Sequence, residues 1–278
     1  MERNLTTGSI WKNIFYFSLP YLLSYFLQTL YGMADLFIIG QFEGAAGTTA
    51  VSIGSQVMHM ITVIIVGLAM GTTVSIAQAV GAKDKKQASR CTGNTITLFL
   101  GVSVVLMVIL LLLVKPIVLV MSTPFEAVSG TVAYLTICFI GIPFIIAYNI
   151  ISSIFRGLGD SKSPMYFIAV ACAANIALDY LFMGALHLGP SGAALGTTLS
   201  QTLSVILALI AIRKRDTGIR LTRSDLSPQT AVMGQILKIG VPIALQDGFI
   251  QIAFIIITII ANPVSYTHLR AHETGRNL

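Results

Sequence analysis

Charged residues are scarce in this 278-residue chain, at 10% of the sequence, whereas a soluble globular domain carries about 25%. The chain has only four histidines and three cysteines, and the cysteines form neither a Cys-x-x-Cys pair nor a mixed Cys/His motif. It also has no Walker loop, so its sequence does not indicate ATP as an energy source. These shortages disfavour a soluble enzyme and a metalloprotein. The hydrophobic residues, 55% of the chain, therefore define its class.

Long apolar runs fill the stretches that lack charge. A helix needs about 20 mostly apolar residues to cross a bilayer, and only helices and closed barrels satisfy their backbone groups inside lipid. The runs here are continuous rather than alternating, which favours helices. We therefore predict an all-α, polytopic membrane protein with seven spans, at about residues 13–40, 51–79, 95–114, 131–155, 164–186, 191–212 and 237–262.

The basic residues fall between these spans in a regular way. With a cytoplasmic N-terminus, the inside segments hold fourteen Lys and Arg residues, and the outside loops before the end of the seventh span hold only Lys115. The positive-inside rule then predicts a multi-pass protein whose N-terminus is cytoplasmic. The same rule explains the net charge of +6. We expect the lipid bilayer, and not nucleic acid, as a partner, because no basic face carries interleaved aromatic residues.

The first and seventh spans resemble each other at an offset of 222 residues, and the positions that align are Ile14/Ile236, Leu19/Val241, Pro20/Pro242 and Leu23/Leu245. This similarity fits two six-helix repeats, as in some transporters. We predict an N-lobe at 1–215, a cytoplasmic linker at 216–236 and the first helix of a truncated C-lobe at 237–262. The last sixteen residues, 263–278, follow an apolar span abruptly, so we expect a non-native tail there and leave it out of the fold.

Three carboxylates fall inside predicted spans: Asp35, Asp179 and Asp247. A carboxylate at mid-membrane costs roughly 3 kcal/mol, so each is either an ion site or a group near a helix end that reaches the interface. Asn175 and Asp179 are four residues apart and share one helix face. An amide oxygen beside a carboxylate suits a hard cation such as Na⁺, and it equally suits a carboxylate that carries a proton.

Four segments together resemble the MATE family of multidrug and toxic compound extrusion transporters, over about residues 10–262. They are SLPYLLSYFLQTLYGMADLFIIGQF with Asp35, FRGLGDSKSPM from Phe155, NIALDYLFM from Asn175 and GPSGAALGTTLSQ from Gly189. The resemblance is to the N-terminal part of DinF- and NorM-like members. It implies a prokaryotic plasma-membrane protein of twelve helices when complete, which exchanges Na⁺ or H⁺ for drugs or organic cations and uses no further cofactor.

The resemblance also implies roles for individual residues. Asp35, Asn175, Asp179 and Thr197 would form the cation or proton site, with Thr198 as the neighbouring alternative to Thr197. Gln28 and Tyr134 would line the same cavity, and Pro20 would let the first helix bend. The missing C-lobe of the same polypeptide would be the partner that completes the transporter.

Three other functions are weighed against antiport. A flippase for lipid-linked saccharides has a related architecture, but its cavity needs basic residues, which these spans almost lack. An intramembrane aspartyl protease would use Asp160 in GLGD with Asp179 as its partner. A passive channel would show flux without ion coupling.

Overall fold

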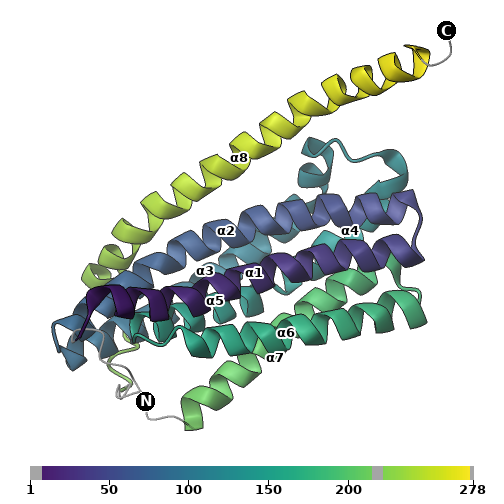
Figure 1. Ribbon diagram of the computed structural model, residues 1–278. Helices are drawn as coiled ribbons and strands as arrows, with labels where there is room; N and C mark the ends of the chain where they lie inside the picture. Colours follow the sequence, from purple (N-terminus) through teal and green to yellow (C-terminus); the bar gives the residue numbers. More distant parts are fainter. Residues whose placement is uncertain (1–7, 215–221, 276–278) are drawn as a thin grey trace.

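The computed structural model describes residues 8–214 and 222–275, and every regular element in these ranges is helical (Figure 1). The fold class is therefore confirmed. In chain order the helices are α1 (Ile10–Phe42), α2 (Ala45–Gly81), α3 (Lys85–Val120), α4 (Phe125–Ile140), α5 (Ile142–Gly157), α6 (Lys162–Asp179), the π-helical segment η1 (Tyr180–Ala185), α7 (Gly189–Lys214) and α8 (Thr230–Gly275).

Within the described residues, six helices are long and apolar enough to cross a membrane, and the bent pair α4 and α5 is a seventh if it forms one span. The predicted fourth span at 131–155 falls on this pair, and the structure adds a bend of 49° between α4 and α5 that was not predicted. Pro143 has no N–H to donate to the carbonyl four residues earlier, which weakens the helix at this point. A Cβ on Gly141 would lie 2.7 Å from Cγ2 of Thr198, so glycine lets the corner approach α7 closely.

The helices extend beyond the predicted spans. Helix α3 begins at Lys85 rather than near residue 95, and the Asp84 carboxylate caps it by accepting a hydrogen bond from the N–H of Gln87 at 2.9 Å. Helix α8 begins at Thr230, inside the predicted linker, and its backbone continues to Gly275 through most of the predicted tail. Residues 215–221 and 276–278 of these two segments lie outside the described residues. Hydropathy detects only the membrane-crossing part of a helix, so it misses turns that project into the interface.

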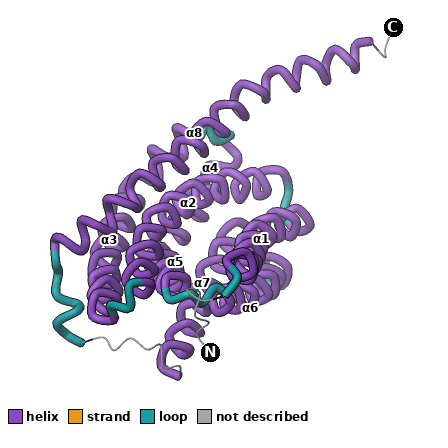
Figure 2. The backbone as a smooth tube through the Cα atoms, turned by 60° about the vertical axis from the view of Figure 1, so that its left-hand side comes forward, coloured by secondary structure: helices purple, strands orange, loops and turns teal. Residues whose placement is uncertain are grey.

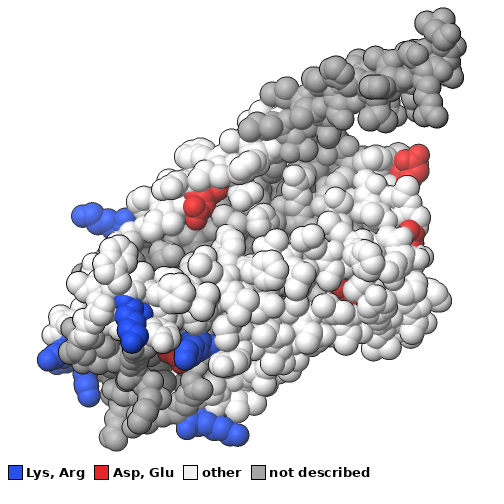
Figure 3. All heavy atoms as spheres, viewed as in Figure 1, with Lys and Arg blue, Asp and Glu red and all other residues white. Residues whose placement is uncertain are grey.

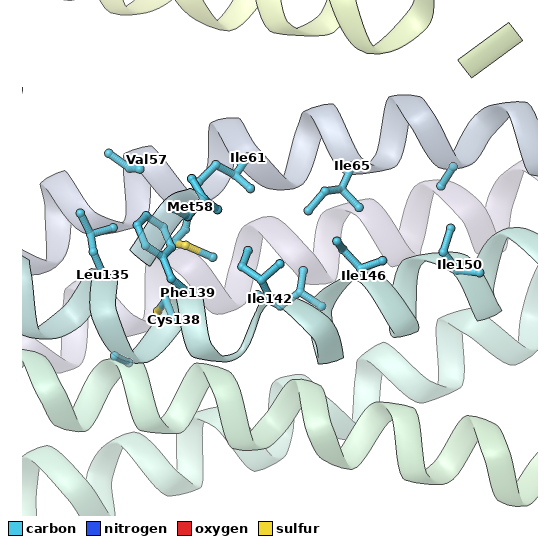
Figure 4. Packing of buried hydrophobic residues seen from close by; sticks show 14 of the residues in the cluster. Val57, Met58, Ile61, Ile65, Leu135, Cys138, Phe139, Ile142, Ile146 and Ile150 are labelled. Atoms are coloured by element: carbon cyan, nitrogen blue, oxygen red, sulfur yellow. The ribbon is translucent and has the colours of Figure 1, made fainter. Parts of the chain in front are cut away.

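Helix α2 is the centre of the bundle and packs against α1, α3, α4, α5, α7 and α8 (Figure 2). Figure 4 shows its buried side chains facing the α4–α5 corner, with Met58 and Ile61 near Phe139 and Ile65 near Ile146. The core therefore lies along α2, on the side that faces the bend.

Small residues allow α8 to pack tightly on α2. A Cβ on Gly67 would lie 2.6 Å from the Cα of Ala244, and one on Gly71 would lie 2.1 Å from the carbonyl oxygen of Ile236. Gly240 approaches the backbone of Leu68 in the same way. Close backbone contact through small residues four apart is a common packing mode of membrane helices. The start of α8 is thus joined directly to the six-helix unit before it.

The connection between α7 and α8 is attached to α3 by Asn94, which is fully buried. Its side-chain amide donates to the carbonyl oxygen of Asp225 at 3.2 Å, and its side-chain oxygen accepts from the N–H of Gln229 at 2.7 Å. Thr97 adds a bond to the carbonyl oxygen of Leu226 at 2.7 Å. These bonds determine where α8 starts.

The helix order brings the start of α1, the α2–α3 and α5–α6 turns and the end of α7 to one end of the bundle. Basic side chains gather at that end, as Figure 3 shows. The clustering expected from the loop charges is therefore present. That this end is cytoplasmic stays a prediction from the positive-inside rule.

Candidate functional site

Three helices that are distant in sequence bring the predicted coupling residues together. Asp35 comes from α1, Asn175 and Asp179 from α6, and Thr197 from α7, and all four side chains are buried. The Thr197 hydroxyl donates a hydrogen bond to Oδ2 of Asp35 at 3.1 Å. The predicted register is thereby supported, because Thr197 and not Thr198 contacts the carboxylate.

The two carboxyl groups of this cluster lie next to each other, and the Asn175 amide is also close to Asp35. Gly196 allows this arrangement, because a Cβ there would lie 2.2 Å from Oδ1 of Asp179. Two adjacent carboxylates in a dry site repel each other if both are ionised. The pair therefore requires a shared proton or a cation between its oxygens.

The cluster has more buried oxygens than protein donors to satisfy them. Five polar atoms of the cluster are buried and have no hydrogen-bond partner. They are Oδ1 of Asp35, both carboxyl oxygens of Asp179 and both polar atoms of the Asn175 amide. An unsatisfied buried polar atom costs about 1–3 kcal/mol. Carboxylate, amide and hydroxyl oxygens are the ligands that a hard cation takes. The residues present fit a proton or a small cation as the group that would satisfy these oxygens.

The local backbone of α6 changes where the cluster is built. Asp179 is the last residue of the α-helical part, and η1 continues as a wider π-helical segment with the Tyr180 ring packed edge-on against Phe42 of α1, their centroids 6.0 Å apart. Short π-helical segments within α-helices are frequent at functional sites. Here the change from α-helix to π-helix comes directly after Asp179.

The other predicted site residues do not hydrogen-bond to the four, although Tyr134 is close enough to Asp35 for an electrostatic interaction. The Tyr134 ring packs over Gly54 of α2 and its hydroxyl bonds Oγ of Ser55 at 3.1 Å, so Tyr134 mainly joins α4 to α2. Gln28 is half-buried on α1, two turns before Asp35. Their cavity-lining roles stay predictions.

Pro20 is buried inside α1, about 22 Å along the helix from Asp35 at 1.5 Å per residue. The Ser24 hydroxyl donates to the carbonyl oxygen of Pro20 at 2.8 Å, a type of bond that favours helix bending. The bending role of Pro20 stays a prediction.

The sequence reasoning missed two polar residues next to the cluster. Tyr31 and Gln201 lie beside each other, and Tyr31 is also close to Asp35. Tyr31 precedes Asp35 by four residues on α1, and Gln201 follows Thr197 by four on α7, so each extends a polar helix face that was already recognised. Searching each face for further polar residues would have found both.

The two other aspartates considered from the sequence, Asp247 and Asp160, do not join this site. Asp247 lies on α8, which packs on α2 and α3 rather than on α6 or α7. Asp160 accepts hydrogen bonds from the N–H groups of Lys162 and Ser163 and so caps α6. It is separated from Asp179 by the length of that helix, about 28 Å. The protease interpretation is wrong, because its two carboxylates cannot meet.

Comparison with known proteins places the chain in a family. The MatE family model matches residues 20–181. The chain is 31% identical over 244 residues to the probable multidrug resistance protein YpnP of Bacillus subtilis, covering 87% of the chain and 54% of the relative. It is 28% identical to the probable multidrug resistance protein NorM of Thermotoga maritima, covering 96% of the chain and 58% of the relative. The chain thus spans about half the length of these relatives.

Solved structures agree with this assignment. A crystal structure of MATE in the bent conformation has a TM-score of 0.82 and 30% identity, covering 87% of this chain and 54% of that one. An outward-facing conformation of a multidrug resistance MATE family transporter of the MOP superfamily has a TM-score of 0.81 and 30% identity, at the same coverage. These proteins are membrane transporters and not enzymes. The fold and these similarities together show that the chain belongs to the MatE family of membrane transporters.

Proposed function

We propose that this chain is the first half of a secondary active multidrug exporter, in which inward movement of Na⁺ or H⁺ drives the export of organic cations or drugs. The observation that carries the proposal is the meeting of Asp35, Asn175, Asp179 and Thr197 from three helices in one buried cluster. The names of the relatives, which include multidrug export and multidrug resistance proteins, support the substrate class.

Charge favours a cationic or neutral substrate over a lipid-linked saccharide. Within the described residues the buried charged side chains are Asp35, Asp179 and Asp225, and all three are acidic. A flippase cavity would need basic side chains to hold phosphates. Arg156 is a basic side chain that could be considered for holding a phosphate. It lies in the last turn of α5, with its guanidinium 5.2 Å from the centre of the Tyr21 ring.

In the proposed mechanism, the coupling cation enters from outside and neutralises the Asp35–Asp179 pair. Neutralisation removes the penalty for a dry pocket, so α1, α6 and α7 can close around it. Closure with bending at Pro20 then narrows the substrate cavity between the two lobes, which rock to alternate access. The cation must bind one of the two states more tightly, because otherwise it cannot shift their populations.

The experiment is substitution of Asp179 by Asn in a two-lobe version that carries this chain as its first half. We expect Asp179→Asn to abolish gradient-driven dye efflux at unchanged expression, because the pair loses its second negative charge. The matched control is Asp160→Asn, the same change at the other end of α6, where asparagine can still cap the helix. Wild-type efflux by Asp179→Asn would overturn the coupling role.

A further inference from the structure

A second feature lies away from the cation cluster, between α3, α5 and α7. Helices α3 and α7 both pack on α5 but make no contact with each other within the described part of the chain (Figure 2). Between them is a cavity of about 320 Å³, with α5 as its floor. Apolar side chains make up nearly all of its lining, Thr92 and Ser103 being the hydroxyl-bearing exceptions. We propose that this groove binds an acyl chain of an anionic phospholipid from the leaflet at the basic end of the bundle.

The length of the groove matches one leaflet. Along α3 it extends from Thr92, near the basic end, to Ser103, a rise of about 16 Å. The hydrocarbon core of a bilayer is about 30 Å thick, so one leaflet contributes about 15 Å. The rim is apolar and open to the surroundings, with Leu100 67% and Leu209 49% exposed. An acyl chain entering at the basic end would therefore run the whole length of the groove.

The groove is separate from the surface on which α8 packs. Helix α8 packs on α2 and α3, and neither α8 nor α1 contributes to the lining of the groove.

The ends of both walls carry the charge that an anionic headgroup requires. Lys85 is exposed at the first position of α3, two turns before Thr92 and on the same helix face. Arg213 is exposed on α7 and directly follows Ile212, which lines the groove. Basic side chains gather at this end of the molecule in Figure 3. Each basic residue near a membrane surface favours anionic lipid by about fivefold.

The groove and the cation cluster are both built partly on α7. Thr197, Gln201, Val205 and Leu209 follow one another at intervals of four along α7, in a row that winds around the helix, and the last two line the groove. An acyl chain against Val205 and Leu209 would therefore contact the helix that supplies Thr197 to the cluster, on a different face. This lipid site is independent of the proposed export function, because it requires only that the chain is embedded in a membrane.

The test uses the purified chain and native mass spectrometry in mild detergent, with dioleoyl phosphatidylglycerol and dioleoyl phosphatidylcholine as competing probes. We expect preferential retention of phosphatidylglycerol. The double variant Lys85→Gln/Arg213→Gln should reduce that preference by about fivefold for each side chain removed. The control Lys12→Gln/Lys162→Gln makes the same charge change at the same end, on helices that do not line the groove, and should retain the preference.

A second variant tests the groove itself. Ala147→Phe places a ring on the floor of the groove and should abolish lipid retention, whereas Val170→Phe places the same ring on an exposed position of α6 and should not. Equal retention of the two lipids by the unmodified chain would overturn the proposal. Unchanged retention by Ala147→Phe would overturn it as well. If Ala147→Phe fails to fold, the Lys85→Gln/Arg213→Gln variant still decides the outcome, because both of its residues are exposed.

Discussion

Aspartates occur in two regions of this molecule, and their surroundings differ sharply. At the basic end, Asp84, Asp160 and Asp225 each accept hydrogen bonds from nearby N–H or hydroxyl groups within a turn or helix cap. Inside the bundle, Asp35 accepts one hydrogen bond, from the Thr197 hydroxyl, and the carboxyl oxygens of Asp179 accept none. The first group stabilises local structure. The second leaves oxygens available for a proton or a cation.

The difference shows why burial alone does not identify a functional carboxylate. Asp225 has only 8% of its surface exposed, although it lies in a turn at the end of the bundle, and the hydroxyl and N–H of Thr222 satisfy its carboxylate. A carboxylate in apolar surroundings is stable only when paired, hydrogen-bonded or neutralised. Unsatisfied oxygens on two adjacent carboxylates therefore indicate function more strongly than membrane depth does.

Of the substitutions that test this difference between the two groups of aspartates, we expect the largest effect on efflux at Gly196. An alanine Cβ would lie 2.2 Å from Oδ1 of Asp179, so Gly196→Ala must displace the carboxyl from the pair. We expect loss of gradient-driven dye efflux in the two-lobe protein, comparable to that of Asp179→Asn. Gly101→Ala, where a Cβ meets open space on α3, should retain efflux and stabilise the helix by about 1 kcal/mol. Normal efflux by Gly196→Ala would contradict the tight fit.

A smaller effect is expected from Thr197→Val, which keeps the side-chain shape but removes the donor to Asp35. Hydrogen bonds to charged groups contribute about 1.5–3 kcal/mol. We therefore expect the apparent affinity for the coupling cation, measured as the cation concentration for half-maximal efflux, to fall by at least about tenfold. Thr202→Val is the control, because the Thr202 hydroxyl bonds the carbonyl oxygen of Thr198 within the same helix. If both variants lose the same affinity, the bond to Asp35 has no special role.

The smallest effect is expected at the partnered end. Hydrogen bonds from the Thr222 hydroxyl and N–H hold the pKa of Asp225 below its usual range. Asp225 therefore stabilises the folded turn above about pH 4, the ordinary value of an aspartate, and this contribution is lost as the pH falls through the lowered pKa.

Thr222→Val removes the hydroxyl bond and should shift the Asp225 titration toward that ordinary value, as measured by carbon-13 NMR of the carboxyl group. Efflux near neutral pH should not change, because Asp225 is ionised in both forms. An unshifted titration would show that the hydroxyl does not stabilise the carboxylate.

Much of the fold could be predicted from hydropathy and loop charge. The seven predicted spans follow from the length of apolar runs and from the alternation of basic loops, two properties that are local in the sequence. The α4–α5 corner was missed because residues 131–155 form one apolar run, although Gly141 and Pro143 mark the break. The start of α8 was missed because its first two turns mix polar residues with apolar ones and so carry only a weak hydropathy signal.

The site was predictable where one helix supplies two residues. Asn175 and Asp179 share a face at a spacing of four, and that pairing needs no tertiary information. The meeting of Asp35 with Asp179 depends on how α1 packs against α6, and Thr197 joins them through α7. The spacing along each helix already places Tyr31 and Gln201 on polar faces, but their proximity to each other arises only when α1 and α7 come together.

The sequence alone determined that this protein crosses a membrane in helices, that its basic residues lie at one end, and that its spans contain carboxylates whose burial in the membrane costs free energy. These properties depend on the cost of placing charge and unpaired backbone in lipid, which each segment meets separately. Only the tertiary structure decided which polar groups share a pocket, that α3 and α7 leave a groove over α5, and that small residues join α8 to α2. Such contacts depend on side-chain shape across helices distant in sequence, because van der Waals packing and close backbone approach govern helix association in lipid.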